Sequence, residues 1–375
     1  MDKFSLVDIK KINYSDVYHY IYNNAGSSKQ AIASALGMSL PTVTQHLNSL
    51  LSEELIQKCG QLNSNIGRKA IAYSILPNAR ISLGIEILEN YIAILAINLR
   101  GEAIAKRIVD IHFEKSETYT RQVSEEINLF IKDEIHTSPH ILGIGFGMQG
   151  LVSSDGKEVV YGQILDYTGL TIDSFSKYLN YPCRFVHDSE CAASSDLWNH
   201  KEATDIFYLS LSHHLGGAVI LQGNIHPGYS GTSGVIEHMT LFPGGKECYC
   251  GKKGCADAYC AVSALLYEDE TLEDFFTNKT AKSKEHLKRF DKYLDNLAIV
   301  INNIHMVINL PVMLGGHMSP YLEDSDTETL FQKVCALSAF PETESFISLG
   351  TREKSAIAIG AGLPFIKEYL DNLAL

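Results

Sequence analysis

The sequence predicts a small, mostly helical N-terminal module followed by a larger α/β body of two lobes. Two patterns carry this prediction. Two short helical segments flank a glycine turn within the first 80 residues, and beyond them a strand hairpin followed by alternating strands and helices occurs twice. The length of 375 residues fits two or three domains. We expect these boundaries: the module at 1–75, a linker at 76–80, the first lobe at 81–196, and the second lobe at 197–375, whose last helix returns to the first lobe.

The composition is that of a globular chain able to bury sizeable cores, with 45% hydrophobic and 20% charged residues. No apolar run approaches transmembrane length, and the N-terminus lacks the apolar core of a signal peptide. We therefore expect a cytoplasmic protein without membrane contact. Of the eight cysteines, three are clustered and five are scattered. In a chain with no export signal this favours reduced thiols and a metal site over a disulfide framework.

The net charge of −13 is unevenly distributed along the chain. The first 80 residues contain eight Lys or Arg and five Asp or Glu, whereas the remainder contains 23 basic and 39 acidic residues. A mildly basic head on an acidic body suits a small nucleic-acid module joined to a domain with a different partner.

The head contains three predicted helices with recognisable ends. Residues 14–25 have helical patterning. Ser28 fits the N-cap of a second helix that ends at Gly37, and Ser39 can cap a third helix over residues 40–55. The apolar stripe of the second helix is predicted at Ile32, Ala35 and Leu36.

The polar face of the third helix predicts contact with DNA. Glutamine and asparagine can read adenine edges in the major groove, and threonine can meet phosphate or a thymine methyl group. Residues 55–56 and 70–75 read as the two strands of a wing, which completes a winged helix-turn-helix. The alternative is a solvated face on a small three-helix interaction domain. The predicted DNA contacts are Ser39, Thr42, Thr44, Gln45, His46, Asn48, Arg68 and Lys69.

The body alternates strands and helices, as expected for two α/β lobes around a cleft. Strands are predicted within residues 81–88, 91–99, 101–113, 140–152, 183–186, 205–223 and 310–319. Helices are predicted at 117–135, from near residue 188, and within 356–363.

A cysteine-rich stretch predicts a metal site. Cys248, Cys250 and Cys255 have C-x-C-x4-C spacing, and His238 lies shortly upstream. Three thiolates and one imidazole are a ligand set that tetrahedral zinc prefers, and a filled shell leaves no open position for water. We therefore expect a structural rather than a catalytic zinc. The alternative, ordinary buried cysteines, is disfavoured by this spacing beside a glycine-rich turn.

Several motifs together resemble the ROK family, which groups bacterial sugar repressors, uncharacterised open reading frames and sugar kinases. The zinc signature appears as CYCGKKGCAD at 248–257, the preceding element as GVIEH at 234–238, and the sugar-cleft pair as His187-Asp188. Glycine pairs stand at 216–217 and 315–316. The resemblance covers essentially the whole chain. It implies a two-lobed, actin/hexokinase-like (ribonuclease H-like) body with a structural zinc site, preceded in the repressor branch by a winged helix-turn-helix.

Departures from the family pattern argue against kinase activity. The family's kinases hold ATP phosphates with D-x-G-G-T and G-T-G-x-G-G turns, where glycines let backbone N–H groups approach the oxygens. At those positions this chain has residues 86–90 (EILEN) and 212–217 (SHHLGG), and Glu89 sets a carboxylate against phosphate. Phosphoryl transfer depends on positioning and neutralising the phosphates, so we expect no enzymatic activity. His213 and His214 are interpreted as polar loop residues.

The resemblance also implies a sugar cleft with altered contacts. Asp188 stands at the family's catalytic base and hydroxyl acceptor, although a helix N-cap is the alternative role. Val235 replaces a glutamate that contacts hydroxyls, and Asp257 is one methylene shorter than the family's glutamate. The effector therefore need not be glucose or N-acetylglucosamine. The expected effector contacts are Gln149, Gly150, His187, Asp188, Val235, His238 and Asp257.

These expectations describe a sugar-responsive repressor of carbohydrate uptake or catabolism genes. A homodimer or homotetramer would present two winged helices to a palindromic double-stranded operator, and a sugar or sugar derivative between the lobes would alter their spacing. Two alternatives remain at this point: an ATP-dependent sugar kinase, and a regulator whose body responds to a protein partner.

Overall fold

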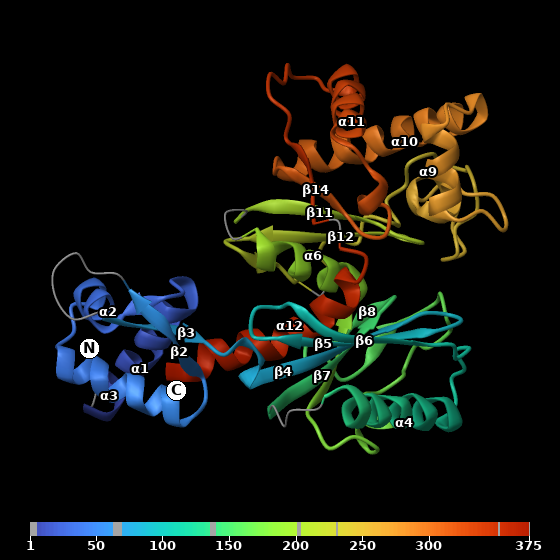
Figure 1. Cartoon of the computed structure of the whole chain (residues 1–375). Coiled ribbons are helices and arrows are strands. Elements are labelled where there is room, and N and C mark those ends of the chain that lie inside the picture. The colour runs from blue at the N-terminus through green and yellow to red at the C-terminus, as the bar shows by residue number, and fades with distance from the viewer. Residues whose placement is uncertain are drawn as a thin grey trace.

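The computed structural model describes residues 6–62, 70–135, 140–200, 204–229, 232–351 and 353–374. It contains a small N-terminal head and two stacked α/β lobes, each built on a five-stranded sheet (Figure 1). Within the described ranges, no helix combines the length and the apolar character that crossing a bilayer requires.

The head packs three helices against a three-stranded antiparallel sheet of order β1-β3-β2. Its elements are α1 (Leu6–Asn23), β1 (Ser27–Ser28), α2 (Lys29–Leu36), α3 (Leu40–Ser52), β2 (Ile56–Leu62) and β3 (Ala70–Ile75). The predicted caps are confirmed. The Ser28 and Ser39 side chains accept the backbone N–H groups of Ala31 and Thr42, and Gly37 ends α2 with a φ of 63°.

Four expectations for the head need correction. The first helix begins at Leu6, eight residues earlier than predicted, and the first wing strand runs on to Leu62. Ala33, rather than Ala35, completes the buried stripe of α2. His46 is only 2% exposed, because Tyr14 of the longer α1 packs edge-on against its ring at 6.1 Å. His46 therefore does not share the exposed face of α3.

The first lobe contains a mixed sheet of order β10-β7-β4-β5-β6. Strands β4, β7 and β10 are parallel, and β5 and β6 are antiparallel additions. Its elements are η1 (Pro77–Ala79), β4 (Arg80–Ile87), β5 (Ile92–Asn98), β6 (Ala103–Val109), α4 (Glu117–Glu134), β7 (His140–Met148), β8 (Leu151–Val152), β9 (Val159–Tyr161), α5 (Asp173–Ser176), β10 (Cys183–His187) and α6 (Asp188–Asn199).

The second lobe contains a sheet of order β13-β12-β11-β14-β15, with β11 parallel to β14 and antiparallel to β12. Its strands are β11 (Ile206–Leu211), β12 (Leu215–Leu221), β13 (Asn224–Ile225), β14 (Val312–Gly315) and β15 (Ile347–Leu349). Its helices are α7 (Asp257–Cys260), α8 (Val262–Leu265), α9 (Leu272–Thr280), α10 (Lys284–Ile308), η2 (Ser319–Tyr321) and α11 (Asp324–Leu337). The chain then continues into α12 (Ala356–Asp371) and η3 (Asn372–Ala374).

Helices α6 and α12 lie between the two sheets, and α12 runs on toward the head (Figure 1). Glycines permit this close packing. A Cβ built at Gly84 of β4 would lie 1.6 Å from the carbonyl oxygen of Ala358, and one at Gly145 of β7 would lie 1.8 Å from that of Ala361. A Cβ at Gly360 would meet the backbone of Cys191 in α6. The last long helix is thereby held directly against the first-lobe sheet.

The head is attached to the body by a shared hydrophobic cluster and by polar contacts. Val17 and Ile21 of α1 belong to the same buried cluster as Leu95 of β5 and Ile366 of α12. The Tyr22 hydroxyl donates to the carbonyl of Leu99 at 2.8 Å. The head therefore contacts the β5 region of the first lobe and helix α12.

Candidate functional site

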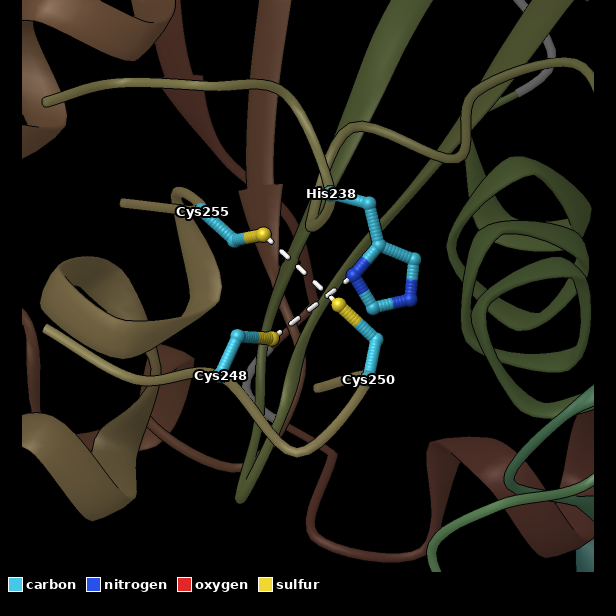
Figure 2. A group of neighbouring side chains, drawn as sticks. All are labelled: His238, Cys248, Cys250 and Cys255. Atoms are coloured by element: carbon cyan, nitrogen blue, oxygen red, sulfur yellow. Dashed lines mark hydrogen bonds between the residues drawn. The ribbon is translucent and has the colours of Figure 1, made fainter. Parts of the chain in front are cut away.

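Four side chains form a compact cluster in the second lobe. Figure 2 shows His238, Cys248, Cys250 and Cys255 pointing toward a common centre, and their ligand atoms all lie within 4.8 Å of one another. The Cys250 and Cys255 sulfurs are 3.7 Å apart, and Cys248 Sγ is 3.8 Å from His238 Nδ1. Zinc–sulfur bonds in a tetrahedral site place two sulfurs about 3.8 Å apart, so the spacing fits that metal. The predicted ligand set is thus brought together.

Backbone turns create the cluster. Gly251 and Gly254 adopt φ values of 80° and 86°, and the Gly251 N–H donates to the Cys248 carbonyl at 2.9 Å. A Cβ at Gly254 would lie 1.9 Å from the Phe242 carbonyl oxygen. On its other ring nitrogen, His238 Nε2 lies 3.3 Å from the Tyr249 hydroxyl, which orients the imidazole with Nδ1 toward the sulfurs.

A small pocket of about 50 Å³ adjoins the cluster and lies between the two lobes. It receives residues from the end of β7, from the start of α6, and from the loop that leads to the cysteines. Its lining residues are Gln149, Gly150, Leu151, Tyr161, Gln163, Ile164, His187, Asp188, Ser189, His214, Leu215, Val235, Glu237, His238 and Tyr249. Six of the seven expected effector contacts line this small pocket.

Asp188 sits in the first turn of α6, and His187 is the N-cap residue. The N-cap alternative for Asp188 is therefore wrong. Its Oδ1 accepts the Ser189 N–H at 2.7 Å and lies 3.3 Å from His187 Nε2. The carboxylate is thus anchored at a helix N-terminus while it lines the small pocket, a position in which a carboxylate is stabilised.

Asp257 does not line the small pocket, although a direct contact was expected. It is only 5% exposed. Its Oδ1 accepts the Leu215 N–H at 2.8 Å, and its Oδ2 lies 3.2 Å from His214 Nδ1. Asp257 therefore orients His214, which does line the pocket. His214 is not a plain polar loop residue.

Sequence reasoning missed Glu237 as a site residue. Its side chain is 8% exposed, and Oε2 has no hydrogen-bond partner among the described residues. Burial, with smaller contributions from the charges of Asp188 and Asp257, raises the pKa of Glu237 to about 8. A buried carboxyl oxygen without a partner is costly, so a ligand hydroxyl at this place would satisfy it. The available signal was the glutamate of GVIEH at 234–238, which directly precedes the cluster ligand His238.

The two altered phosphate turns line a second, larger cavity. This chamber has a volume of about 620 Å³ and is defined by Leu88, Glu89, Asn90, Tyr91, Gln149, Ile164, Leu165, His213, His214, Val262, Leu266, Leu272, His317, Tyr321 and Lys354. Glu89 is exposed at its wall. Behind the turn, Glu86 of β4 lies 3.3 Å from Nε2 of His317, which follows β14, so an ion pair joins the two lobes.

In the head, Gln45 and Asn48 are exposed on α3, and Thr42 and Thr44 are half-buried. The Ser39 and Thr42 hydroxyls lie 2.8 Å apart, and Thr44 donates to the Leu40 carbonyl at 2.6 Å. Arg68 and Lys69 lie outside the described residues.

Family models match both parts of the chain. The model of the ROK family covers residues 82–361, and a model of winged helix-turn-helix DNA-binding domains covers residues 16–57.

Curated relatives have low but extensive similarity. The xylose repressor of Bacillus subtilis is 25% identical over 290 residues, which covers 76% of this chain and 75% of the relative. The dual regulator NagC of Escherichia coli is 22% identical over 261 residues, covering 68% and 64%.

Solved structures share the fold. A ROK family transcriptional regulator described as a homologue of the E. coli MLC protein aligns with a TM-score of 0.76 at 19% identity, over 98% of each chain. A ROK family glucokinase from Streptomyces griseus, solved with glucose and AMPPNP, aligns with a TM-score of 0.64 at 14% identity, over 76% of this chain and 98% of the glucokinase.

Proposed function

The chain belongs to the ROK family, and from this premise we propose that it is a transcriptional repressor of carbohydrate uptake or catabolism genes. Its winged head binds double-stranded DNA, and a sugar or sugar derivative in the small pocket modulates that binding. The name of the xylose repressor of Bacillus subtilis supports the choice of a sugar effector.

The observation that carries the proposal is the small pocket itself. Glu237 Oε2 lacks a partner among the described residues, and Asp188 lines the same pocket at the N-terminus of α6. Two carboxyl groups that line one small pocket can form hydrogen bonds with the hydroxyl groups of a polyol.

The chain's residues also support a bound zinc ion. His238, Cys248, Cys250 and Cys255 would hold it in a closed shell, so that the ion stabilises the wall that carries Glu237 and Tyr249. Structural zinc is the proposed cofactor.

DNA recognition is assigned to α3 and the wing. The exposed Gln45 and Asn48 are proposed to read base edges, while Ser39, Thr42 and Thr44 contact the phosphates near the N-terminus of α3. Replacement of Gln45 by Ala should relax base preference. A homodimer or homotetramer would present two such helices to a palindromic site.

The sugar kinase alternative is favoured by the fold, since a glucokinase shares it. Two features argue against kinase activity. The Glu89 carboxylate at the chamber wall repels phosphate, and side chains replace the glycines of the family's phosphate-binding turns. An ADP-release assay with a hexose and pentose panel tests this alternative, and turnover above the level of Asp188→Ala would favour it.

The test of the proposed function has two steps. Genomic DNA fragments retained by the full-length protein identify an operator, and a thermal-shift screen with monosaccharides and disaccharides identifies stabilising ligands. Asp188→Ala should keep operator affinity within about twofold but lose the effector response, because a ligand shifts DNA affinity only through its differential binding to two body conformations. An unchanged response in Asp188→Ala would contradict this assignment of the pocket. If operator binding changed only on addition of a protein, this result would favour the alternative in which a protein partner controls the regulator.

A further inference from the structure

We propose that the effector is a glycoside rather than a free monosaccharide. Its sugar ring binds at the small pocket, and its second ring or aglycone fills the chamber beside the altered phosphate turns. This inference rests on the proposed function, because it assigns the sugar ring to the same small pocket.

The two cavities are neighbours in one cleft. Gln149, Ile164 and His214 line both of them. These three side chains lie between the two cavities, so a ligand anchored in the small pocket reaches the chamber by passing them.

Their volumes are very different. The small pocket, about 50 Å³, has room for about three to five water molecules, which is less than a complete sugar with its hydroxyl groups requires. The chamber, about 620 Å³, falls in the range of ordinary small-molecule sites, which is roughly 300–1,000 Å³. A sugar ring anchored at Asp188 and Glu237 must consequently project part of itself toward the chamber.

The chamber's lining suits a second ring. Leu88, Val262, Leu266 and Leu272 supply apolar surface, and Tyr91 and Tyr321 supply aromatic faces. Such surfaces bind the apolar face of a sugar ring or an aryl group, while the histidines at the edge can exchange hydrogen bonds with hydroxyls.

A polyphosphate fits this lining poorly. Among the described residues that line the chamber, Lys354 is the one Lys or Arg, and the Glu89 carboxylate belongs to the same lining. Burial, followed by the charge of His214, lowers the pKa of His213, so this imidazole stays neutral near pH 7. A neutral glycoside meets no such repulsion.

The test compares matched ligands on the full-length protein by calorimetry. Each pair contains a monosaccharide and its glycosides: xylose with xylobiose and nitrophenyl xyloside, glucose with cellobiose, and N-acetylglucosamine with its β-1,4 dimer. We expect at least one glycoside to bind at least tenfold more tightly than its parent sugar, and to change operator affinity.

Leu272→Trp narrows the chamber without touching the small pocket. It should weaken glycoside binding at least tenfold and leave the parent sugar within about twofold. Leu287→Trp, at an exposed position on α10, is the matched control and should change neither. Should Leu272→Trp fail to fold by circular dichroism, Tyr91→Ala tests the first-lobe side of the chamber, and a three- to tenfold loss for the glycoside alone is expected.

The outcomes separate this inference from the proposed function. A monosaccharide that binds as tightly as all its glycosides and regulates operator binding overturns the inference and supports the function. Tighter binding of ATP or a sugar phosphate also overturns it, since the chamber would then be an anion site. Failure of every sugar and glycoside to bind overturns both.

Discussion

Glu86 Oε1 lies 3.3 Å from His317 Nε2, and this ion pair connects the two lobes. Burial alone would lower the pKa of His317, but the hydrogen bond to Glu86, the charge of Glu86 and that of Asp188 together raise it. Because the folded-state pKa lies above the value of about 6.5 expected for the unfolded chain, the pair stabilises the folded protein fully below that pH. The stabilisation is lost as pH rises through the raised pKa.

We therefore expect the difference in unfolding free energy between the wild-type protein and His317→Gln to shrink as pH rises from about 6 to about 9. Urea unfolding across this range measures it. His112→Gln, at an exposed histidine of the first lobe, is the control and should give a difference that changes little with pH. A difference for His317→Gln that grew with pH would show that the pair does not stabilise the protonated imidazole.

Single residues also show where sequence reasoning stopped. Spacing predicted Cys248, Cys250 and Cys255 as ligands, because side chains on one short turn can converge, and His238 was added as the histidine shortly upstream. It did not predict that Glu237 is buried with an oxygen lacking a described partner, or that Asp257 holds Leu215 and His214. Both depend on how distant segments pack, as does the burial of His46 under α1.

At the scale of elements, the cysteine turn supports one wall of the small pocket. Cys250→Ser should lower the zinc content from about one per chain to near zero and lower the melting temperature by several degrees, because metal binding stabilises the folded turn. Metal analysis and thermal unfolding measure the two effects. Cys335→Ser in α11 is the control, since this cysteine lies apart from the cluster. A Cys250→Ser protein that retained one zinc per chain would contradict the assigned ligand set.

Strand β4 and helix α12 are in backbone contact at Gly84. Gly84→Ala places a methyl group against the Ala358 carbonyl, so α12 must move away from the sheet. We expect a loss of about 3 kcal/mol or more in unfolding free energy, at the upper end of overpacking effects. Chemical denaturation measures it, with Ala103→Ser on the exposed side of β6 as control. A loss of unfolding free energy below about 0.5 kcal/mol would mean that α12 shifts from the sheet at little cost.

The helices and strands were more predictable from the sequence than the tertiary contacts that surround them. The helix beginning at Asp188 and the hairpin of β11 and β12 follow from local pattern and turn residues. The early start of α1 was not predicted, because the helix as a whole is only weakly amphipathic and its sequence pattern does not mark where it begins.

At the scale of the whole molecule, α6 spans the distance from the small pocket to the head. Asp188 lies at its first turn, and near its end Trp198 Nε1 donates to the Arg100 carbonyl at 2.6 Å. Arg100 in turn donates to the Tyr22 carbonyl of α1 at 2.6 Å and lies over the Tyr22 ring. These contacts form a continuous physical path between the proposed effector site and the DNA-binding head.

Arg100→Ala should therefore keep operator binding but reduce the effector's influence on it by about 1–2 kcal/mol, the size of a typical coupling energy. Fluorescence anisotropy with labelled operator, with and without the effector, measures the coupling. Arg107→Ala on β6, whose ion pairs with Asp133 and Glu134 lie away from the head, is the control. If the effector changed operator affinity equally in Arg100→Ala and Arg107→Ala, the contacts of Arg100 would not carry the coupling between the small pocket and the head.

The position of α12 in the chain has a consequence for biosynthesis. This helix packs on strands β4 and β7, which are made first, but it follows the entire second lobe in sequence. We therefore expect that, during translation, apolar surface of the first-lobe sheet stays exposed until residues 356–371 leave the ribosome. The same holds for the hydrophobic cluster that joins this sheet to the head. Nascent chains arrested before residue 356 should therefore recruit chaperones through the first lobe and fail to bind the operator, although every residue of the head is already present.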